Sequence, residues 1–259
     1  MELEGHMAQK AIKVAGGLRT DDEEKEASKN KAIFDANPSN WEIKMENFPK
    51  YVRRQNMTRY LALYEIFKLQ LLVKGSVIEC GVNNGFGTMA WAKFSAILEP
   101  VNLTRRIYGF DTFEGFPGIS EKDRSAASAH VKEGDLAADV HDELCQLIEV
   151  YDSTRYLGHI NKVNLIKGNA IETIPKFIEE NPHIVVSLLY LDFDLYEPTK
   201  VALETFLPRM PKGGILAFDE LDNPLWPGET LAMLESHAER PLKIERLSFD
   251  PYIGFAVLD

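Results

Sequence analysis

From residue 58 onward, amphipathic stretches alternate with short apolar runs. The runs typical of buried strands cover residues 76–82, 106–113, 164–169, 184–193 and 213–220. The stretches typical of helices cover residues 58–72, 88–98, 171–180, 199–207 and 230–238. Strands that alternate with helices predict a parallel sheet covered by helices on both faces.

The end of the chain breaks this pattern. Residues 243–249 and 252–258 form two further apolar runs, joined by the turn signal Asp250-Pro251. A parallel connection needs about a dozen residues or more, so these two runs must pair antiparallel. An α/β fold with a mostly parallel seven-stranded sheet and a terminal antiparallel hairpin resembles the Rossmann-like class I S-adenosylmethionine (SAM)-dependent methyltransferases. We expect this domain over residues 51–259, after an N-terminal arm with a helical extension over residues 1–50, whose opening resembles a tag remnant.

Composition limits the possible partners. The chain is 45% apolar and 27% charged, which is ordinary for a globular protein, and its formal net charge of −11 repels phosphate backbones and anionic lipids. We therefore expect no nucleic-acid or membrane partner. Two cysteines do not make a disulfide framework, and no apolar run reaches membrane-spanning length. These features predict a soluble, cytoplasmic protein.

Glycines follow the first predicted strand, at the edge where open α/β sheets bind ligands. The segment from Glu79 to Thr88 contains Gly81 and Gly85, which allow a tight turn and close approach of a ligand to the backbone. Its spacing differs from Gly-x-Gly-x-x-Gly, which argues against a dinucleotide cofactor. A tight turn without a ligand also fits this segment.

The next strand ends suggest a nucleoside site. Asp111, followed by Thr112 and Phe113, offers a carboxylate that can accept hydrogen bonds from a ribose diol. Asn169 follows the third strand and fits the edge of an adenine. Turn or helix-capping roles are the alternatives for both residues. The segment around Thr58 fits either a cover for the cofactor or a helix cap.

Acidic residues follow the fourth and fifth predicted strands. Asp192 and Asp194 come after one, and Asp219, Glu220 and Asp222 come after the other. If the strands are neighbours, their ends lie about 5 Å apart. Carboxylates so close raise one another's pKa unless a cation neutralises them, and oxygen ligands suit magnesium or manganese rather than zinc. Loop caps and solvated turns are the alternative, which weighs most for Asp194 and Asp222.

Four stretches in this order resemble the macrocin-type (TylF-like) sugar O-methyltransferase family: residues 79–85, 111–117 (DTFEGFP), 192–199 (DFDLYEPT) and 213–220. The resemblance implies that Glu79, Gly81 and Gly85 border the methionine part of SAM and that Asp111 binds its ribose. It also implies that Asp192, Asp219 and Glu220 bind magnesium or manganese. The sequence departs from the family's usual pattern at Glu220, which replaces an aspartate, and at Phe193, which replaces a glycine and would narrow the acceptor site.

The resemblance further implies methylation of a deoxysugar in antibiotic biosynthesis. We expect the 3-hydroxyl of a TDP-deoxysugar as acceptor, as in enzymes of the calicheamicin type, and a homo-oligomer. A divalent ion would lower the pKa of the hydroxyl, and a nearby base would take its proton as the oxygen attacks the SAM methyl group. The candidate bases are Asp192, His130 and His141, although single histidines in polar stretches are usually surface residues.

Three other functions fit parts of the sequence. A catechol-type O-methyltransferase uses a similar acidic metal site on an aromatic diol. A nucleotide-dependent oxidoreductase shares the alternating fold, but the missing Gly-x-Gly-x-x-Gly argues against it. A non-catalytic SAM-binding protein would not need Asp192 and Asp219 at the strand ends.

Overall fold

The computed structural model of the chain describes residues 21–239 and 241–259, which divide into two compact units between Leu61 and Ala62. The predicted tag remnant and the first part of the arm lie outside the described residues. In the first unit, the polar arm forms α2 (Asp21–Ala36), followed by α3 (Trp41–Glu46), η1 (Phe48–Lys50) and the start of α4 (Arg54–Leu69). The Phe34 and Tyr51 rings of this unit meet edge to face, 4.9 Å apart. The predicted domain boundary at residue 50 stays a prediction.

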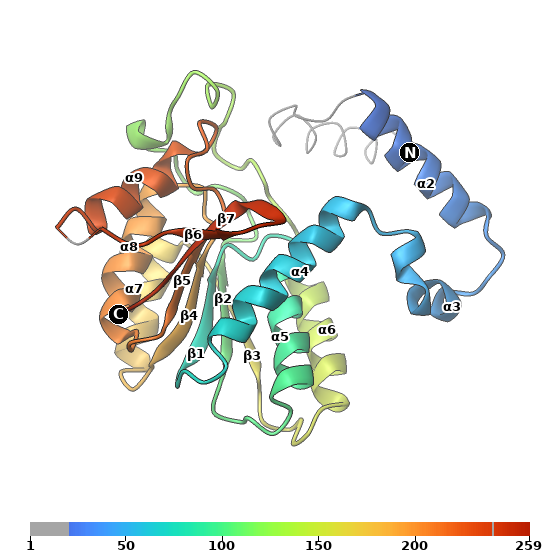
Figure 1. Cartoon of the computed structure of the whole chain (residues 1–259), viewed down its shortest axis with the longest axis horizontal. Helices are drawn as coiled ribbons and strands as arrows, with labels where there is room; N and C mark the ends of the chain where they lie inside the picture. Colours follow the sequence, from blue (N-terminus) through green and yellow to red (C-terminus); the bar gives the residue numbers. More distant parts are fainter. Residues whose placement is uncertain (1–20, 240) are drawn as a thin grey trace. The chain divides into compact units, whose positions relative to one another are not determined.

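The second unit is built on a seven-stranded sheet in the order β3-β2-β1-β4-β5-β7-β6 (Figure 1). Its strands are β1 (Ser76–Cys80), β2 (Ile107–Asp111), β3 (Val163–Lys167), β4 (Val186–Leu191), β5 (Ile215–Phe218), β6 (Glu245–Leu247) and β7 (Asp250–Val257). The first five are parallel, whereas β7 pairs antiparallel with both β5 and β6. The predicted sheet and terminal hairpin are confirmed.

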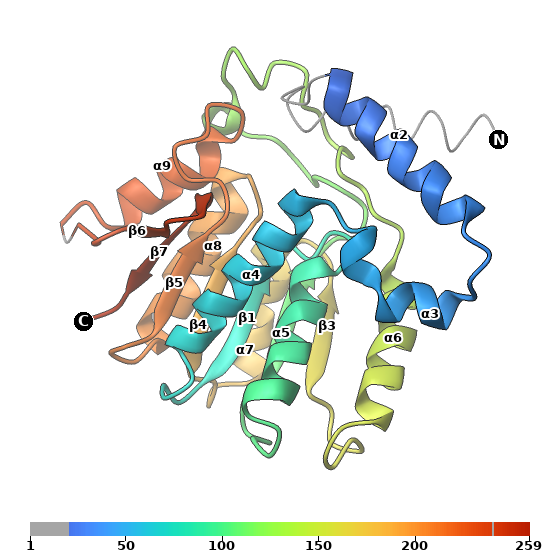
Figure 2. The same cartoon turned by 45° about the vertical axis from the view of Figure 1, so that its right-hand side comes forward.

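Helices cover both faces of the sheet (Figures 1 and 2). On one face lie residues 62–69 of α4 with α5 (Phe86–Leu98) and α6 (His141–Ser153), and on the other lie α7 (Ala170–Glu180), α8 (Tyr196–Phe206) and α9 (Pro227–Ser236). Two short helices, η2 (Glu121–Asp123) and η3 (Leu207–Arg209), complete the unit. Within the described residues, no helix combines the length and apolar character that crossing a membrane requires.

The central strands explain the continuous apolar runs of the sequence. Every residue of β1 and β4 is buried, because both faces of these strands are covered by helices. On the α5 face, Trp91 packs edge to face against Tyr190 of β4, with ring centroids 5.5 Å apart. On the other face, Phe110 and Phe206 pack across the sheet–helix interface at 5.8 Å.

All five helices that the sequence predicts begin earlier than expected, and two of them, α8 and α9, have a proline in the first turn. α8 starts at Tyr196 rather than residue 199, and α9 starts at Pro227 rather than residue 230. Proline within the first helical turn sacrifices no intrahelical hydrogen bond, so Pro198 and Pro227 are accommodated inside these helices. The earlier start of α8 brings the helix end close to Asp192 along the chain.

Candidate functional site

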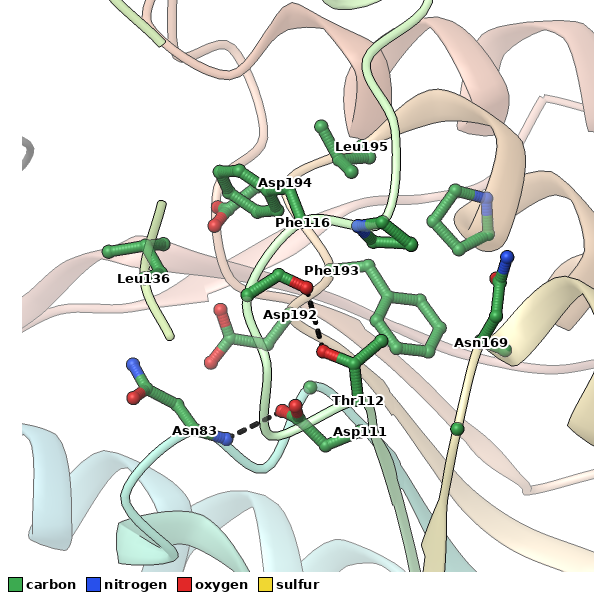
Figure 3. Close-up of a pocket in the computed structure, with 16 residues that line it drawn as sticks. Asn83, Asp111, Thr112, Phe116, Leu136, Asn169, Asp192, Phe193, Asp194 and Leu195 are labelled. Atoms are coloured by element: carbon green, nitrogen blue, oxygen red, sulfur yellow. Dashed lines mark hydrogen bonds between the residues drawn. The ribbon is translucent and has the colours of Figure 1, made fainter. Parts of the chain in front are cut away.

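A pocket lies at the carboxyl ends of the parallel strands (Figure 3). It encloses about 630 Å³ of empty space, a figure that includes open solvent at its mouth. The strand ends and the segments after them supply its walls: Gly81, Asn83, Asp111, Thr112, Gly115, Phe116, Pro117, Leu136, Gly168, Asn169, Ala170, Asp192, Phe193, Asp194, Leu195 and Pro198. In Figure 3, Asp192 and Asn83 lie on one side, and Phe193 and Asn169 lie on the other.

The predicted turn after β1 requires glycine at two positions. Gly81 has φ of 100°, and a Cβ there would overlap the carbonyl oxygen of Asp192. Gly85 has φ of 80°, and a Cβ there would overlap the Leu144 side chain. The turn thus brings β1 close to the start of the β4–α8 loop, and only Gly81 of the two glycines lines the pocket.

We expect Gly81→Ala to destabilise the protein by about 2 kcal/mol or more, since it adds an overlap to an unfavourable backbone angle. The measurement is the unfolding midpoint in urea. Gly118→Ala is the matched control, because a Cβ at Gly118 meets no atom within 4 Å. Equal midpoints for the two variants would contradict the assigned role of Gly81.

Glu79 and Thr88 form a buried pair beneath the turn. Glu79 is 2% exposed, and its carboxylate accepts a hydrogen bond from the hydroxyl of Thr88, which has no exposed surface. Gly87 makes room for this carboxylate at the start of α5, since a Cβ there would overlap Glu79 Oε1. Because Thr88 is fully buried, it contacts Glu79 rather than the pocket, and the predicted cofactor roles of both residues stay predictions.

Asp111 fixes the backbone around the pocket. Its Oδ2 accepts hydrogen bonds from the amides of Val82 and Asn83, both at 2.8 Å, and its Oδ1 accepts one from the amide of Phe113 at 2.6 Å. An ionised carboxylate offers about four acceptor positions, so capacity remains for a ribose hydroxyl. These bonds fit the turn role that the sequence left open as the alternative for Asp111, and the ribose role stays a prediction.

The other predicted nucleoside residues also take part in turns. Asn169 lines the pocket and caps α7, where its side chain accepts from the amide of Ile171 at 3.1 Å. Thr112 lines the pocket, and its hydroxyl donates to the carbonyl of Gly115 at 2.7 Å. Phe113 is buried in a cluster with Val82 and Leu144 rather than on the pocket wall. Thr58 lies on α4 in the first unit, and its predicted role stays a prediction.

Four residues shortly after the strand ends hold left-handed backbone angles without being glycine. They are Asn83 (φ 48°), Phe113 (φ 57°), Asp194 (φ 63°) and Asp222 (φ 61°). Such angles cost about 1–3 kcal/mol each and gather at functional sites, where surrounding contacts enforce them. Asn83 and Asp194 both line the pocket. The strained backbone angles therefore support the pocket at the strand ends as the functional site.

The acidic residues separate into two groups. Leu191 of β4 pairs with Phe218 of β5, so the strands are neighbours, which the sequence interpretation had assumed only as a condition, and Asp192 and Asp219 follow at adjacent ends. Asp192 and Asp194 line the pocket. Asp219 does not: it is 5% exposed and accepts a hydrogen bond from the Tyr190 hydroxyl at 2.8 Å.

The metal prediction fits this arrangement poorly. Glu220 accepts a hydrogen bond from the side-chain amide of Asn223. Over residues 21–239 and 241–259, no three His, Cys, Asp or Glu side chains gather in a way that could hold a metal ion. The side chains as arranged therefore do not form the predicted site of Asp192, Asp219 and Glu220, and magnesium or manganese binding stays a prediction from sequence.

A fourth carboxyl group behind these residues was missed by the sequence interpretation. Glu229, in the first turn of α9, has no exposed surface, and its Oε1 accepts from the amide of Glu220 at 3.0 Å. Burial raises its pKa well above the ordinary value, and the negative charges of Asp194, Asp219 and Glu220 raise it further. Glu229 lies three residues before buried Ala232, a helical spacing that puts both side chains on one face of α9 and could have indicated burial. The signal was weak, because the helix dipole favours an acidic residue in the first turn even where it is exposed.

We expect Glu229→Gln to gain stability relative to the unchanged protein as pH rises. A raised pKa in the folded state means that the folded protein binds the proton more tightly, so the stability contribution falls above the ordinary carboxyl pKa, and glutamine removes this loss. Thermal unfolding at pH 5 and pH 8 measures the effect, with Glu172→Gln in the first turn of α7 as an exposed control. A difference between variant and parent that is independent of pH would contradict the raised pKa of Glu229.

The two candidate histidines lie outside the pocket wall. His130 is exposed in a turn, and His141 begins α6, with its ring 5.1 Å from the ring of Phe113. Among the candidate bases, Asp192 is the one that lines the pocket. The catalytic roles of the three residues stay predictions.

The fold and its strand-end pocket define the class of SAM-dependent O-methyltransferases. The family model for macrocin O-methyltransferase (TylF) matches residues 52–244, and the chain belongs to this family.

Solved structures support the assignment. A crystal structure of CalS11, a calicheamicin methyltransferase, has a TM-score of 0.87 at 33% identity, covering 92% of this chain and 93% of that one. An apo structure of CalS11, described as a TDP-rhamnose 3'-O-methyltransferase, has a TM-score of 0.80 at 31% identity, covering 92% of this chain and 95% of that one. The O-methyltransferase NovP has a TM-score of 0.61 at 21% identity over 78% and 80% of the two chains, which shows a shared fold.

A curated relative comes from Streptomyces olivaceus. It is 8-demethyl-8-(2,3-dimethoxy-alpha-L-rhamnosyl)-tetracenomycin-C 4'-O-methyltransferase, 28% identical over 152 residues. The match covers 57% of this chain, and the chain spans about half of the relative, 53% of its length. The descriptions of this relative and of apo CalS11 both name a rhamnose-type sugar.

Proposed function

We propose that this chain is a SAM-dependent O-methyltransferase that methylates a hydroxyl group of a deoxysugar, namely the 3-hydroxyl of a TDP-activated, rhamnose-type sugar in antibiotic biosynthesis. The observation that carries the proposal is the presence of Asp192 and Asp111 in one pocket at the carboxyl ends of the sheet. The similarity to CalS11 over most of both chains supports the choice of acceptor.

The charge of the pocket suits a sulfonium cofactor. Asp111, Asp192 and Asp194 line it, and no Lys or Arg occurs among its described lining residues. A carboxylate-lined pocket attracts the positive charge of SAM, and the product S-adenosylhomocysteine (SAH) has lost that charge. The same charge pattern holds SAM more strongly than SAH, so the product dissociates more readily than the cofactor.

The proposed chemistry is one displacement. Asp192 accepts the proton of the sugar hydroxyl, the oxygen attacks the methyl carbon, and the carbon–sulfur bond breaks with its electron pair returning to sulfur. The residues that border the pocket hold the two reactants in line, which contributes through proximity and orientation. In this mechanism Asp192 acts as the base by itself, because the described carboxylates do not gather into a metal site.

The test is transfer of labelled methyl groups from SAM to a panel of acceptors. The panel holds TDP-rhamnose, a rhamnoside bound to an aglycone, and a catechol, each with magnesium and with EDTA. Transfer to TDP-rhamnose supports the proposal, whereas transfer to the catechol alone would replace it with the catechol-type alternative. Tight SAH binding without transfer to any acceptor would favour the non-catalytic alternative.

Two further parts of the proposal have their own readouts. Loss of transfer in EDTA, restored by magnesium, would support the metal dependence predicted from sequence. Light scattering during gel filtration measures the mass of the particle, and a mass above that of one 29.3 kDa chain would support the predicted homo-oligomer.

A further inference from the structure

The segment between β2 and α6 contributes one wall of the pocket. We call residues 115–136 the covering segment; Phe116, Pro117 and Leu136 of this segment line the pocket. Its two ends are joined, because the amide of Phe116 donates to the carbonyl of Asp135 at 3.1 Å and the amide of Gly134 donates to the carbonyl of Phe116 at 3.0 Å. Apart from η2 it lacks regular structure, and ordered loops of this length usually have a function.

One buried carboxylate organises the covering segment. Asp123 is 6% exposed, and its Oδ2 accepts from both the amide and the hydroxyl of Ser120 at 2.7 Å. The hydroxyl of Ser128 donates to the Asp123 carbonyl at 3.0 Å. A buried charge is tolerated when hydrogen bonds surround it; Ser120 supplies two to the Asp123 carboxylate, whereas Ser128 binds the main chain of Asp123 and fixes its backbone.

The same carboxylate reaches the start of α8. Asp123 Oδ1 accepts from the amide of Tyr196 at 2.6 Å, across 73 positions of sequence. The residue at the N-cap position of α8 is Leu195, which makes no capping hydrogen bond. Asp123 therefore supplies the cap that the local sequence lacks, and its negative charge favours the positive end of the helix dipole.

This bond joins two walls of the pocket. Asp194 and Leu195, directly before Tyr196, line the pocket, and the catalytic candidate Asp192 lies two positions before Asp194. Asp194 also holds φ of 63°, an angle that neighbouring contacts must enforce. The Asp123–Tyr196 bond fixes the chain directly after that strained residue.

A third element closes the arrangement. At Gly228 in α9, a Cβ would overlap Asp123 Oδ1 and lie 2.5 Å from the Tyr196 nitrogen, so glycine allows the three elements to meet. The ring of Phe116 packs edge to face on Trp226 at 5.6 Å, and the hydroxyl of Ser125 donates to the Pro224 carbonyl at 2.5 Å. The covering segment is thus attached to both α8 and the loop before α9.

Resting on the proposed function, we propose that Asp123 is a positioning residue for the sugar acceptor, because it holds the covering segment against the loop that carries Asp192. The predicted ribose-binding residue Asp111 depends on Asp123 less. Its carboxylate binds the amides of Val82, Asn83 and Phe113, and all three lie outside the covering segment. Loss of the Asp123 carboxylate should therefore weaken binding of the sugar acceptor more than binding of SAM.

The experiment compares Asp123→Ala and Asp123→Asn with the unchanged chain. Asparagine keeps an oxygen for the Tyr196 amide but loses an acceptor for Ser120, so it gives a milder change if the alanine variant does not fold. Asp152→Ala is the control, since Asp152 lies on α6, binds Arg155 at 2.7 Å and is outside the pocket. The readouts are KM for TDP-rhamnose, Kd for SAH, unfolding midpoint and hydrogen exchange of residues 115–136.

For the Asp123 variants we expect KM for the acceptor to rise about tenfold or more, Kd for SAH to change less than about threefold, and exchange in residues 115–136 to increase. Asp152→Ala should lower only the unfolding midpoint. A lower midpoint with unchanged KM and unchanged exchange in the Asp123 variants would reduce Asp123 to a structural cap and overturn the proposal. If the unchanged chain transfers methyl to no sugar, the proposed function fails, whereas the exchange measurement still decides whether Asp123 holds the segment; unchanged exchange would overturn this proposal as well.

Discussion

Asp192→Asn is expected to lower kcat about a thousandfold, because asparagine has nearly the same shape but cannot take a proton, and general-base catalysis typically contributes factors of about 10²–10⁴. Asp192 is the candidate base that lines the pocket. The affinity for SAH should change little, since the pocket keeps its shape. The measurements are steady-state methyl transfer and calorimetric titration with SAH.

The control for this variant is Asp139→Asn, which makes the same chemical change at an exposed position before α6. It should leave kcat unchanged. If Asp192→Asn retains kcat within about threefold of the parent, proton transfer by Asp192 is excluded as a rate-determining contribution. The alanine variants of His130 and His141 then become the next measurements.

Asp111→Ala is expected to weaken SAH binding about a hundredfold and to lower the unfolding midpoint. Three backbone amides would lose their acceptor, and the amides of buried Val82 and Phe113 cost about 1–3 kcal/mol each when they are left unpaired. The glycine turn that borders the pocket would lose its support. Calorimetry and urea unfolding measure the two effects separately.

The ribose contact predicted for Asp111 needs a double-mutant cycle, since the structural role alone also weakens binding. The cycle compares SAH with its 2'-deoxy analogue on the parent and on Asp111→Ala. If the carboxylate binds the ribose, removal of the hydroxyl weakens binding to the parent but has little further effect on the variant. Equal losses on both proteins would leave Asp111 with the backbone role alone.

Much of the fold could be predicted because its signals are local. The apolar runs of β1 and β4 are continuous, as expected of strands covered on both faces. The final hairpin was predicted, but its turn lies at residues 248–249, and Asp250 and Pro251, predicted to form the turn, begin β7. Gly81 and Gly85 lie in the predicted turn with positive φ, and Gly81 lines the pocket, whereas their predicted cofactor roles stay predictions. Helix starts were less accurate, because Pro198 and Pro227 are compatible with a first helical turn as well as with a preceding loop.

The sequence by itself determined that acidic residues would follow the fourth and fifth strands, since the strands and their chain order follow from local periodicity, whereas the sheet order β4-β5 came from the tertiary structure. Only the tertiary structure decided where each carboxylate is directed: Asp192 into the pocket, Asp219 toward Tyr190, and Glu229 toward the Glu220 amide. The link from Asp123 to Tyr196 likewise joins residues 73 positions apart, and no local pattern encodes it. Such contacts depend on how the covering segment and α8 pack together, whereas propensity and periodicity report on each segment alone.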